Sequence, residues 1–149
     1  MRTFVTYEGK RGIWFFSLDA DSPWAVEAAR LVYRLPYHRA SITVARRGDW
    51  IDYLSSRNGA SLDLSFRPAG PVNPPEPGSL EHFLTERYCL YTEHRGRLHS
   101  ADIHHLPWPL QQAGAEIREN TMSPAALEGD PLLHFSERQD VVIWPLERL

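Results

Sequence analysis

Apolar and polar residues alternate along several short stretches of the chain, and this pattern predicts β-strands. It is clearest in residues 61–67, where Leu62, Leu64 and Phe66 fall on one side of an extended chain and polar residues on the other. Other stretches are predicted as strands because they are rich in aromatic and β-branched residues. The predicted strands are Thr3–Tyr7, Ile13–Leu18, Ser41–Arg46, Trp50–Ser55, Ser61–Arg67, Tyr88–Thr92, Leu98–His104, Ala113–Glu119 and Val141–Trp144. A strand with one polar face is typical of an antiparallel sheet.

Two helices are predicted between these strands. Ser22 and Pro23 begin the first, as N-cap and first helical residue, and Pro36 ends it because the residue before a proline avoids helical angles. Its apolar residues form a broad stripe at helical spacing: Trp24, Ala25, Ala28, Ala29, Leu31 and Val32. Ser79 caps a second, short helix. The predicted fold class is therefore α+β, mainly antiparallel β, with two short helices.

The length of 149 residues suits a single domain, which we expect to span residues 1–149. Five prolines between positions 68 and 78 are interpreted as a rigid surface loop, because neither flank is long enough for a comfortable domain. The first predicted strand begins at the very start of the chain, with no residues leading into it. We therefore expect that part of the domain is missing upstream.

Charge and composition narrow the functional classes. The net charge is −3 and 42% of residues are hydrophobic, which argues against disorder and against a basic nucleic-acid-binding tail. The single cysteine, Cys89, excludes an internal disulfide framework and fits a reducing cytoplasm. With no long apolar run and no signal peptide, we expect a cytoplasmic protein that binds neither membrane nor nucleic acid.

Candidate nucleophiles and metal ligands are few. Of 16 basic residues 15 are arginine, so Lys10 is the only amine that could form a Schiff base, and we predict it on a solvated turn at residues 9–12. The adjacent His104 and His105 should point to opposite sides of a strand. No histidine spacing matches a zinc site, so we expect no metal and no cofactor. Cys89 is interpreted as a small buried residue, since a reactive thiol needs an electropositive, exposed setting.

Residues 81–88 carry the densest group of functional side chains: two carboxylates, an imidazole, a guanidinium and a phenol. Arg87 could bind a carboxylate and Glu86 could relay protons. The alternative is a solvated helix face with local ion pairs. Trp108, held between two prolines, is predicted either to line a pocket or to cap the core.

Several strings of residues together resemble the YqjF-like family of bacterial domains of unknown function. They are Phe15-Phe16-Ser17-Leu18-Asp19-Ala20, Leu35-Pro36-Tyr37, residues 78–88, residues 104–110, Leu133-His134-Phe135 and Asp140-Val141 with Trp144-Pro145. This family is similar to the acetoacetate decarboxylase superfamily, so the resemblance implies a curved antiparallel β-barrel around a small cavity. It also implies further strands ahead of residue 1. That decarboxylase works through a lysine Schiff base, and the single lysine argues against this chemistry here.

Three functional hypotheses follow. The leading one is a domain that binds a small apolar or acidic metabolite in a barrel cavity, with Glu86, Arg87, His104 and Trp108 as ligand-binding residues. The second is a lyase or hydrolase that lacks a Schiff base and uses Glu86 and His104 as acid and base. The third is a structural or interaction domain in which exposed strand edges, such as Arg2–Tyr7, pair two copies into a homodimer.

Overall fold

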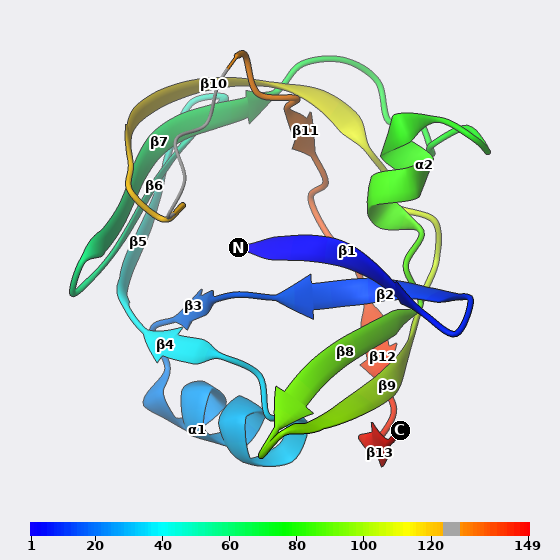
Figure 1. Cartoon of the computed structure of the whole chain (residues 1–149). Helices are drawn as coiled ribbons and strands as arrows, with labels where there is room; N and C mark the ends of the chain where they lie inside the picture. The colour runs from blue at the N-terminus through cyan, green and yellow to red at the C-terminus, as the bar shows by residue number, and fades with distance from the viewer. Residues whose placement is uncertain (124–128) are drawn as a thin grey trace.

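The computed structural model describes residues 1–123 and 129–149 and contains strands in two larger sheets, a small strand pair and two helices (Figure 1). The helices are α1 (Pro23–Tyr33) and α2 (Leu80–Thr85). The strands are β1 (Arg2–Tyr7), β2 (Lys10–Phe15), β3 (Leu18–Ala20), β4 (Tyr37–Arg39), β5 (Ser41–Arg47), β6 (Trp50–Arg57), β7 (Ala60–Pro68), β8 (Cys89–His94), β9 (Arg97–His105), β10 (Gln111–Asn120), β11 (His134–Phe135), β12 (Val141–Ile143) and β13 (Glu147–Arg148). The prediction of a mainly β protein with two helices is confirmed.

The first sheet has the order β1-β2-β8-β9-β12, and β13 also pairs with β9. Its pairs are antiparallel except β2 with β8, where Ile13 lies beside Leu90 in parallel register. Leu90 is buried together with Ala101 of β9 and Leu35, and this cluster forms the main core. Helix α2 contacts this sheet at its edge strand, where the rings of Phe83 and Phe4 of β1 lie 5.5 Å apart.

The hairpin of β1 and β2 turns earlier than predicted. Glu8 and Gly9 both have positive φ values, which is the backbone of a two-residue type I′ turn. The predicted turn at residues 9–12 is therefore wrong, because Lys10 already pairs with Tyr7 as the first residue of β2. Gly12 also lies inside β2. A Cβ atom there would come within 2.8 Å of the Cys89 carbonyl oxygen, so close strand packing requires this glycine.

The second sheet is antiparallel throughout, in the order β11-β10-β7-β6-β5. The predicted alternation of β7 is present, but the polar side is not simply wet. Ser65 is buried because its hydroxyl donates to Asp52 (2.5 Å) and accepts from Arg118 (2.8 Å). Arg47 also pairs with Asp52, at 2.6 Å. Long charged side chains therefore cover the polar face of the sheet.

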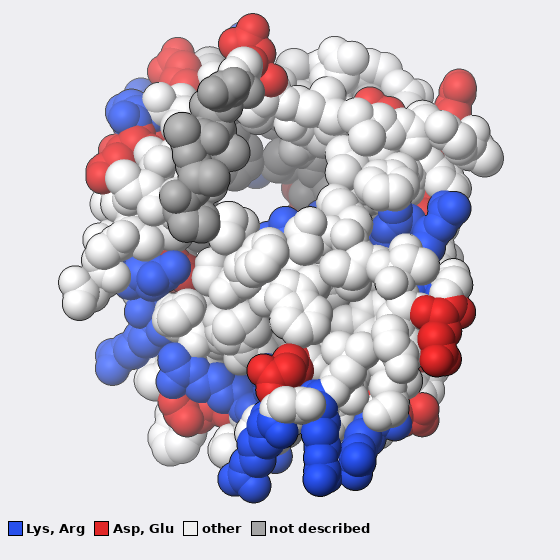
Figure 2. Space-filling view, in the orientation of Figure 1, with Lys and Arg blue, Asp and Glu red and all other residues white. Residues whose placement is uncertain are grey.

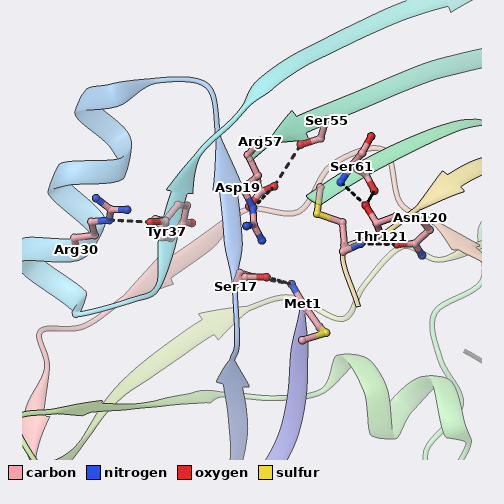
Figure 3. A network of polar contacts seen from close by, with 11 residues as sticks. Met1, Ser17, Asp19, Arg30, Tyr37, Ser55, Arg57, Ser61, Asn120 and Thr121 are labelled. Atoms are coloured by element: carbon pink, nitrogen blue, oxygen red, sulfur yellow. Dashed lines mark hydrogen bonds and ion pairs between the residues drawn. The ribbon is translucent and has the colours of Figure 1, made fainter. Parts of the chain in front are cut away.

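Within residues 1–123 and 129–149, no strand of the first sheet pairs with a strand of the second sheet. A polar contact crosses between the parallel β3–β4 pair and the second sheet instead (Figure 3). Arg57 of β6 donates to both carboxylate oxygens of Asp19 of β3, at 3.0 and 3.2 Å, and Ser55 lies 3.5 Å from the same carboxylate. The described strands thus form two sheets without hydrogen-bonded closure, and the closed barrel that the resemblance implied is not present among them. Figure 2 shows an opening in this face of the molecule.

Helix α1 begins as predicted, with the Ser22 hydroxyl accepting from the Ala25 N–H group at 3.3 Å. The helix ends at Tyr33, ahead of Pro36, which was predicted to end it. It ends there because Arg34 takes a left-handed conformation. The predicted apolar stripe faces the solvent: the side chain of Trp24 is 84% exposed, and Leu31 is exposed as well. The opposite side of the helix, where Val26 is buried, packs on the β3–β4 pair.

Two further expectations from the sequence concern the membrane and the pairing of two copies of the chain. No helix in residues 1–123 or 129–149 is long and apolar enough to cross a membrane. Strand β1 is hydrogen-bonded to β2 on one side and forms an edge of the first sheet in the described strands. Such an edge is what pairing of two copies would need. Dimer formation through β1 stays a prediction, which light scattering of the purified chain would test.

Candidate functional site

The chain segment between α2 and β8 positions the candidate site. Ser79 caps α2, its hydroxyl accepting from the N–H group of His82 at 3.1 Å. The helix ends at Glu86, whose N–H group still donates to the His82 carbonyl at 2.9 Å, and β8 begins three residues later. Only the three residues 86–88 connect the short helix to the buried strand. The side chains of residues 86–88 are therefore held at the boundary between core and surface.

Arg87 is buried, with 4% of its surface exposed. Its guanidinium lies over the ring of Phe83, 4.1 Å from the centroid, and also over Phe4 at 5.3 Å. Nη1 donates to the Glu86 carbonyl at 3.1 Å, whereas Nε is buried and has no hydrogen-bond partner. Among the described residues it forms no ion pair. Burial, followed by repulsion from Arg11, lowers the pKa of Arg87.

Glu86 faces the same region from the adjacent position. The Tyr88 hydroxyl donates a short hydrogen bond to Glu86 Oε2, while Oε1 is buried and has no partner. This hydrogen bond and, secondly, burial raise the pKa of Tyr88 to about 12. Tyr88 thus remains a neutral donor over the physiological range and fixes the orientation of the carboxylate.

Trp108 approaches this group through His105. The imidazole of His105 stacks on the Tyr88 ring with 4.8 Å between centroids and meets Trp108 edge-on at 6.0 Å. Its ring nitrogens lie 2.8 Å from the Leu106 carbonyl oxygen and 3.3 Å from that of Arg87. The indole Nε1 of Trp108 is buried and has no partner. His105 therefore connects residues 86–88 to Trp108, a role that the sequence did not suggest.

A half-open pocket of about 330 Å³ lies between α2 and the β2–β8 pair. It is lined by Lys10, Arg11, Gly78, Ser79, His82, Phe83, Glu86, Arg87, Tyr88 and Cys89. Figure 2 shows basic side chains gathered between α2 and the β1–β2 hairpin on this face. Three basic residues and one carboxylate line the pocket, so its field favours an anion.

The structure brings together two of the four predicted ligand-binding residues. Glu86 and Arg87 line this pocket, whereas Trp108 does not line it and contacts His105, which stacks on Tyr88. His104 is exposed on the other side of β9 and lines a neighbouring pocket of about 390 Å³ with Asp102. The predicted acid–base pair of Glu86 and His104 is therefore divided between two pockets, and the structure gives this pairing no support.

Lys10 lies between these two pockets and belongs to the lining of both. Its amine is 2.5 Å from Asp102, and about half of each side chain is exposed. That hydrogen bond raises the pKa of Lys10, so the amine stays charged. An amine nucleophile needs the opposite shift. No group of three His, Cys, Asp or Glu side chains in the described ranges is arranged to hold a metal ion.

Cys89 is buried at the inner wall, and burial raises the pKa of its thiol. This matches the interpretation of an inert, small core residue. The sequence missed the aromatic rings of Phe4 and Phe83 beneath Arg87. Phe83 is only four positions from Arg87, so their closeness in sequence was a signal that could have suggested the contact. Phe4 could not, because its contact depends on how β1 and α2 pack.

Comparison with known proteins identifies the family to which the chain belongs. The model of DUF2071, a family described as an uncharacterized conserved protein, matches residues 1–140. The chain belongs to this family. It is 48% identical, over an alignment of 155 positions, to the uncharacterized protein YqjF of Bacillus subtilis (strain 168), covering 99% of this chain and 64% of that protein. The resemblance inferred from the sequence is thereby confirmed.

Two solved structures show the same fold at 12% sequence identity. Acetoacetate decarboxylase from Legionella pneumophila superposes with a TM-score of 0.65, covering 99% of this chain and 64% of the decarboxylase. A second acetoacetate decarboxylase structure gives 0.57, with 66% of its chain covered. The DUF2071 chain thus spans slightly less than two thirds of the length of these relatives. At this identity the likeness concerns the fold alone.

Proposed function

We propose that this DUF2071 chain binds a small anionic metabolite, a carboxylate, in the pocket between α2 and the β2–β8 pair. The observation that supports the proposal is the buried guanidinium of Arg87, whose Nε has no partner. Leaving a buried charged donor without a partner is costly, more so than for a neutral group. An unsatisfied buried group in a native protein calls for an explanation such as a functional role or a bound water or ion, and we infer a ligand that supplies the missing acceptor.

The surroundings of Arg87 suit a carboxylate better than an apolar ligand. The guanidinium carbon of Arg87 lies over the rings of Phe83 and Phe4, and Nε is left without a partner. Arg11 adds a second positive charge at the pocket wall. A volume of about 330 Å³ is at the lower end of the ~300–1,000 Å³ typical of small-molecule sites. No residue of the second sheet lines this pocket, so the site that we propose is beside the first sheet and is not a barrel cavity.

A thermal-shift screen of small carboxylates tests this proposal. A ligand at a hundred times its Kd stabilises a protein by about 2.7 kcal/mol, which corresponds to roughly 5–10 °C in Tm for a chain of this size. Arg87→Met keeps the length of the side chain and removes the charge, so it should abolish the shift. Arg138→Met, at an arginine that is 80% exposed and distant in sequence, is the matched control and should keep it. A chain that no small carboxylate stabilises, at matched ionic strength, would contradict the proposal.

A further inference from the structure

A second polar group of the pocket defines what the anion must carry besides its carboxylate. Glu86 presents two oxygens, of which Oε2 accepts from the Tyr88 hydroxyl and Oε1 is buried without a partner. An ionised carboxylate can only accept hydrogen bonds. The described residues supply no donor to Oε1, so an occupant of the pocket that satisfies it must itself be a donor.

The charges of the pocket decide what kind of donor this is. Arg11 and Arg87 exceed Glu86 by one positive charge, even if Lys10 is left out because it is paired with Asp102. An ammonium group would also donate to Oε1, but it would cancel the charge of the ligand carboxylate in a pocket that has an excess of positive charge. A neutral hydroxyl donates to Oε1 and leaves the ligand a monoanion, which the excess charge favours.

The size of the proposed ligand follows from the positions of Glu86 and Arg87, which line the same pocket. Glu86 and Arg87 are consecutive and joined by a trans peptide, so their Cα atoms are about 3.8 Å apart. Both side chains line one pocket. Because both groups line one pocket of about 330 Å³, we take the ligand to be short, with its hydroxyl one or two carbons from its carboxylate. We propose, building on the function proposed above, that the pocket selects short hydroxycarboxylates, with the carboxylate on Arg87 and the hydroxyl on Glu86.

Calorimetric titration of the full chain with matched acids tests this inference. L-Lactate is compared with propionate, which lacks the hydroxyl, and 3-hydroxybutyrate is compared with butyrate. A hydrogen bond to a charged group predicts that each hydroxy acid binds about tenfold or more tightly than its partner. Pyruvate replaces the donor by an acceptor and alanine adds an ammonium group, so both should bind more weakly than lactate.

Two variants connect the preference to Glu86. Glu86→Gln keeps the size of the side chain and an oxygen for Tyr88, so propionate should still bind while the preference for lactate falls to about twofold or less. Glu81→Gln is the matched control, because Glu81 is also on α2 but lines a different pocket beside His134. It should keep the full preference.

The outcomes separate the two proposals. If none of the acids binds, the carboxylate-binding function and the inference both fail. If lactate and propionate bind equally, or pyruvate binds most tightly, the function stands and the hydroxyl selectivity is overturned. The wild-type comparison decides this point even if Glu86→Gln folds poorly.

Discussion

Asp19 should be worth far more to stability than an ordinary surface carboxylate. Its side chain is 11% exposed and that of Arg57 is 20% exposed, and they join β3 to β6 through two contacts of 3.0 and 3.2 Å (Figure 3). Exposed ion pairs contribute about 0–1 kcal/mol, whereas breaking a buried pair costs about 3–5 kcal/mol. The pair is mostly buried, so Asp19→Ala should lower the free energy of unfolding by about 3 kcal/mol.

Urea denaturation measures this loss, and the matched control is Asp140→Ala. Asp140 also pairs with an arginine, Arg138, but both side chains are about 80% exposed. Its replacement should change stability by less than about 0.5 kcal/mol. In thermal unfolding, Asp19→Ala should lower Tm by roughly 6–12 °C. Equal effects of the two substitutions would refute the idea that this contact connects the β3–β4 pair to the second sheet.

Two further predictions concern the first sheet and the tyrosine of the site. Gly12→Ala should destabilise the chain by several kcal/mol, because its Cβ would meet a backbone carbonyl at 2.8 Å, whereas Gly114→Ala, with its nearest neighbours at 4.0 Å, should be tolerated in the same denaturation assay. Spectrophotometric titration should show Tyr88 ionising near pH 12, and Glu86→Gln should bring its pKa back toward 10. Since the fold raises this pKa, the stabilisation is complete below pH 10 and is lost as pH rises through about 12. An unchanged titration in Glu86→Gln would show that Tyr88 does not donate to Glu86.

The parts of the fold that sequence reasoning predicted depend on local pattern. The alternation in β7 and the Ser-Pro start of α1 are set by neighbouring residues, and both are present. Exposure of the apolar stripe of α1 is not local, because it depends on which side of the helix packs on β3 and β4. The Trp24 side is left in water for that reason.

The candidate site divides in the same way. Glu86 and Arg87 come together because they are consecutive, so their sequence string predicted their proximity. His104 went to another pocket because successive residues of β9 point to opposite sides, while His105 points toward Tyr88. The contacts of Arg87 with Phe4, and of Lys10 with Asp102, join residues more than 80 positions apart. No pattern within a single segment could have predicted these contacts.

The most direct test of the central claim is an NMR titration of the Arg87 Nε–H group. Its resonance is identified by its loss in Arg87→Met, and lactate is then added to ¹⁵N-labelled protein at constant ionic strength. Because Nε is buried without a partner, a carboxylate bound there should shift this resonance downfield in a saturable manner. A resonance that stays in place while lactate is raised to high concentration would contradict the account.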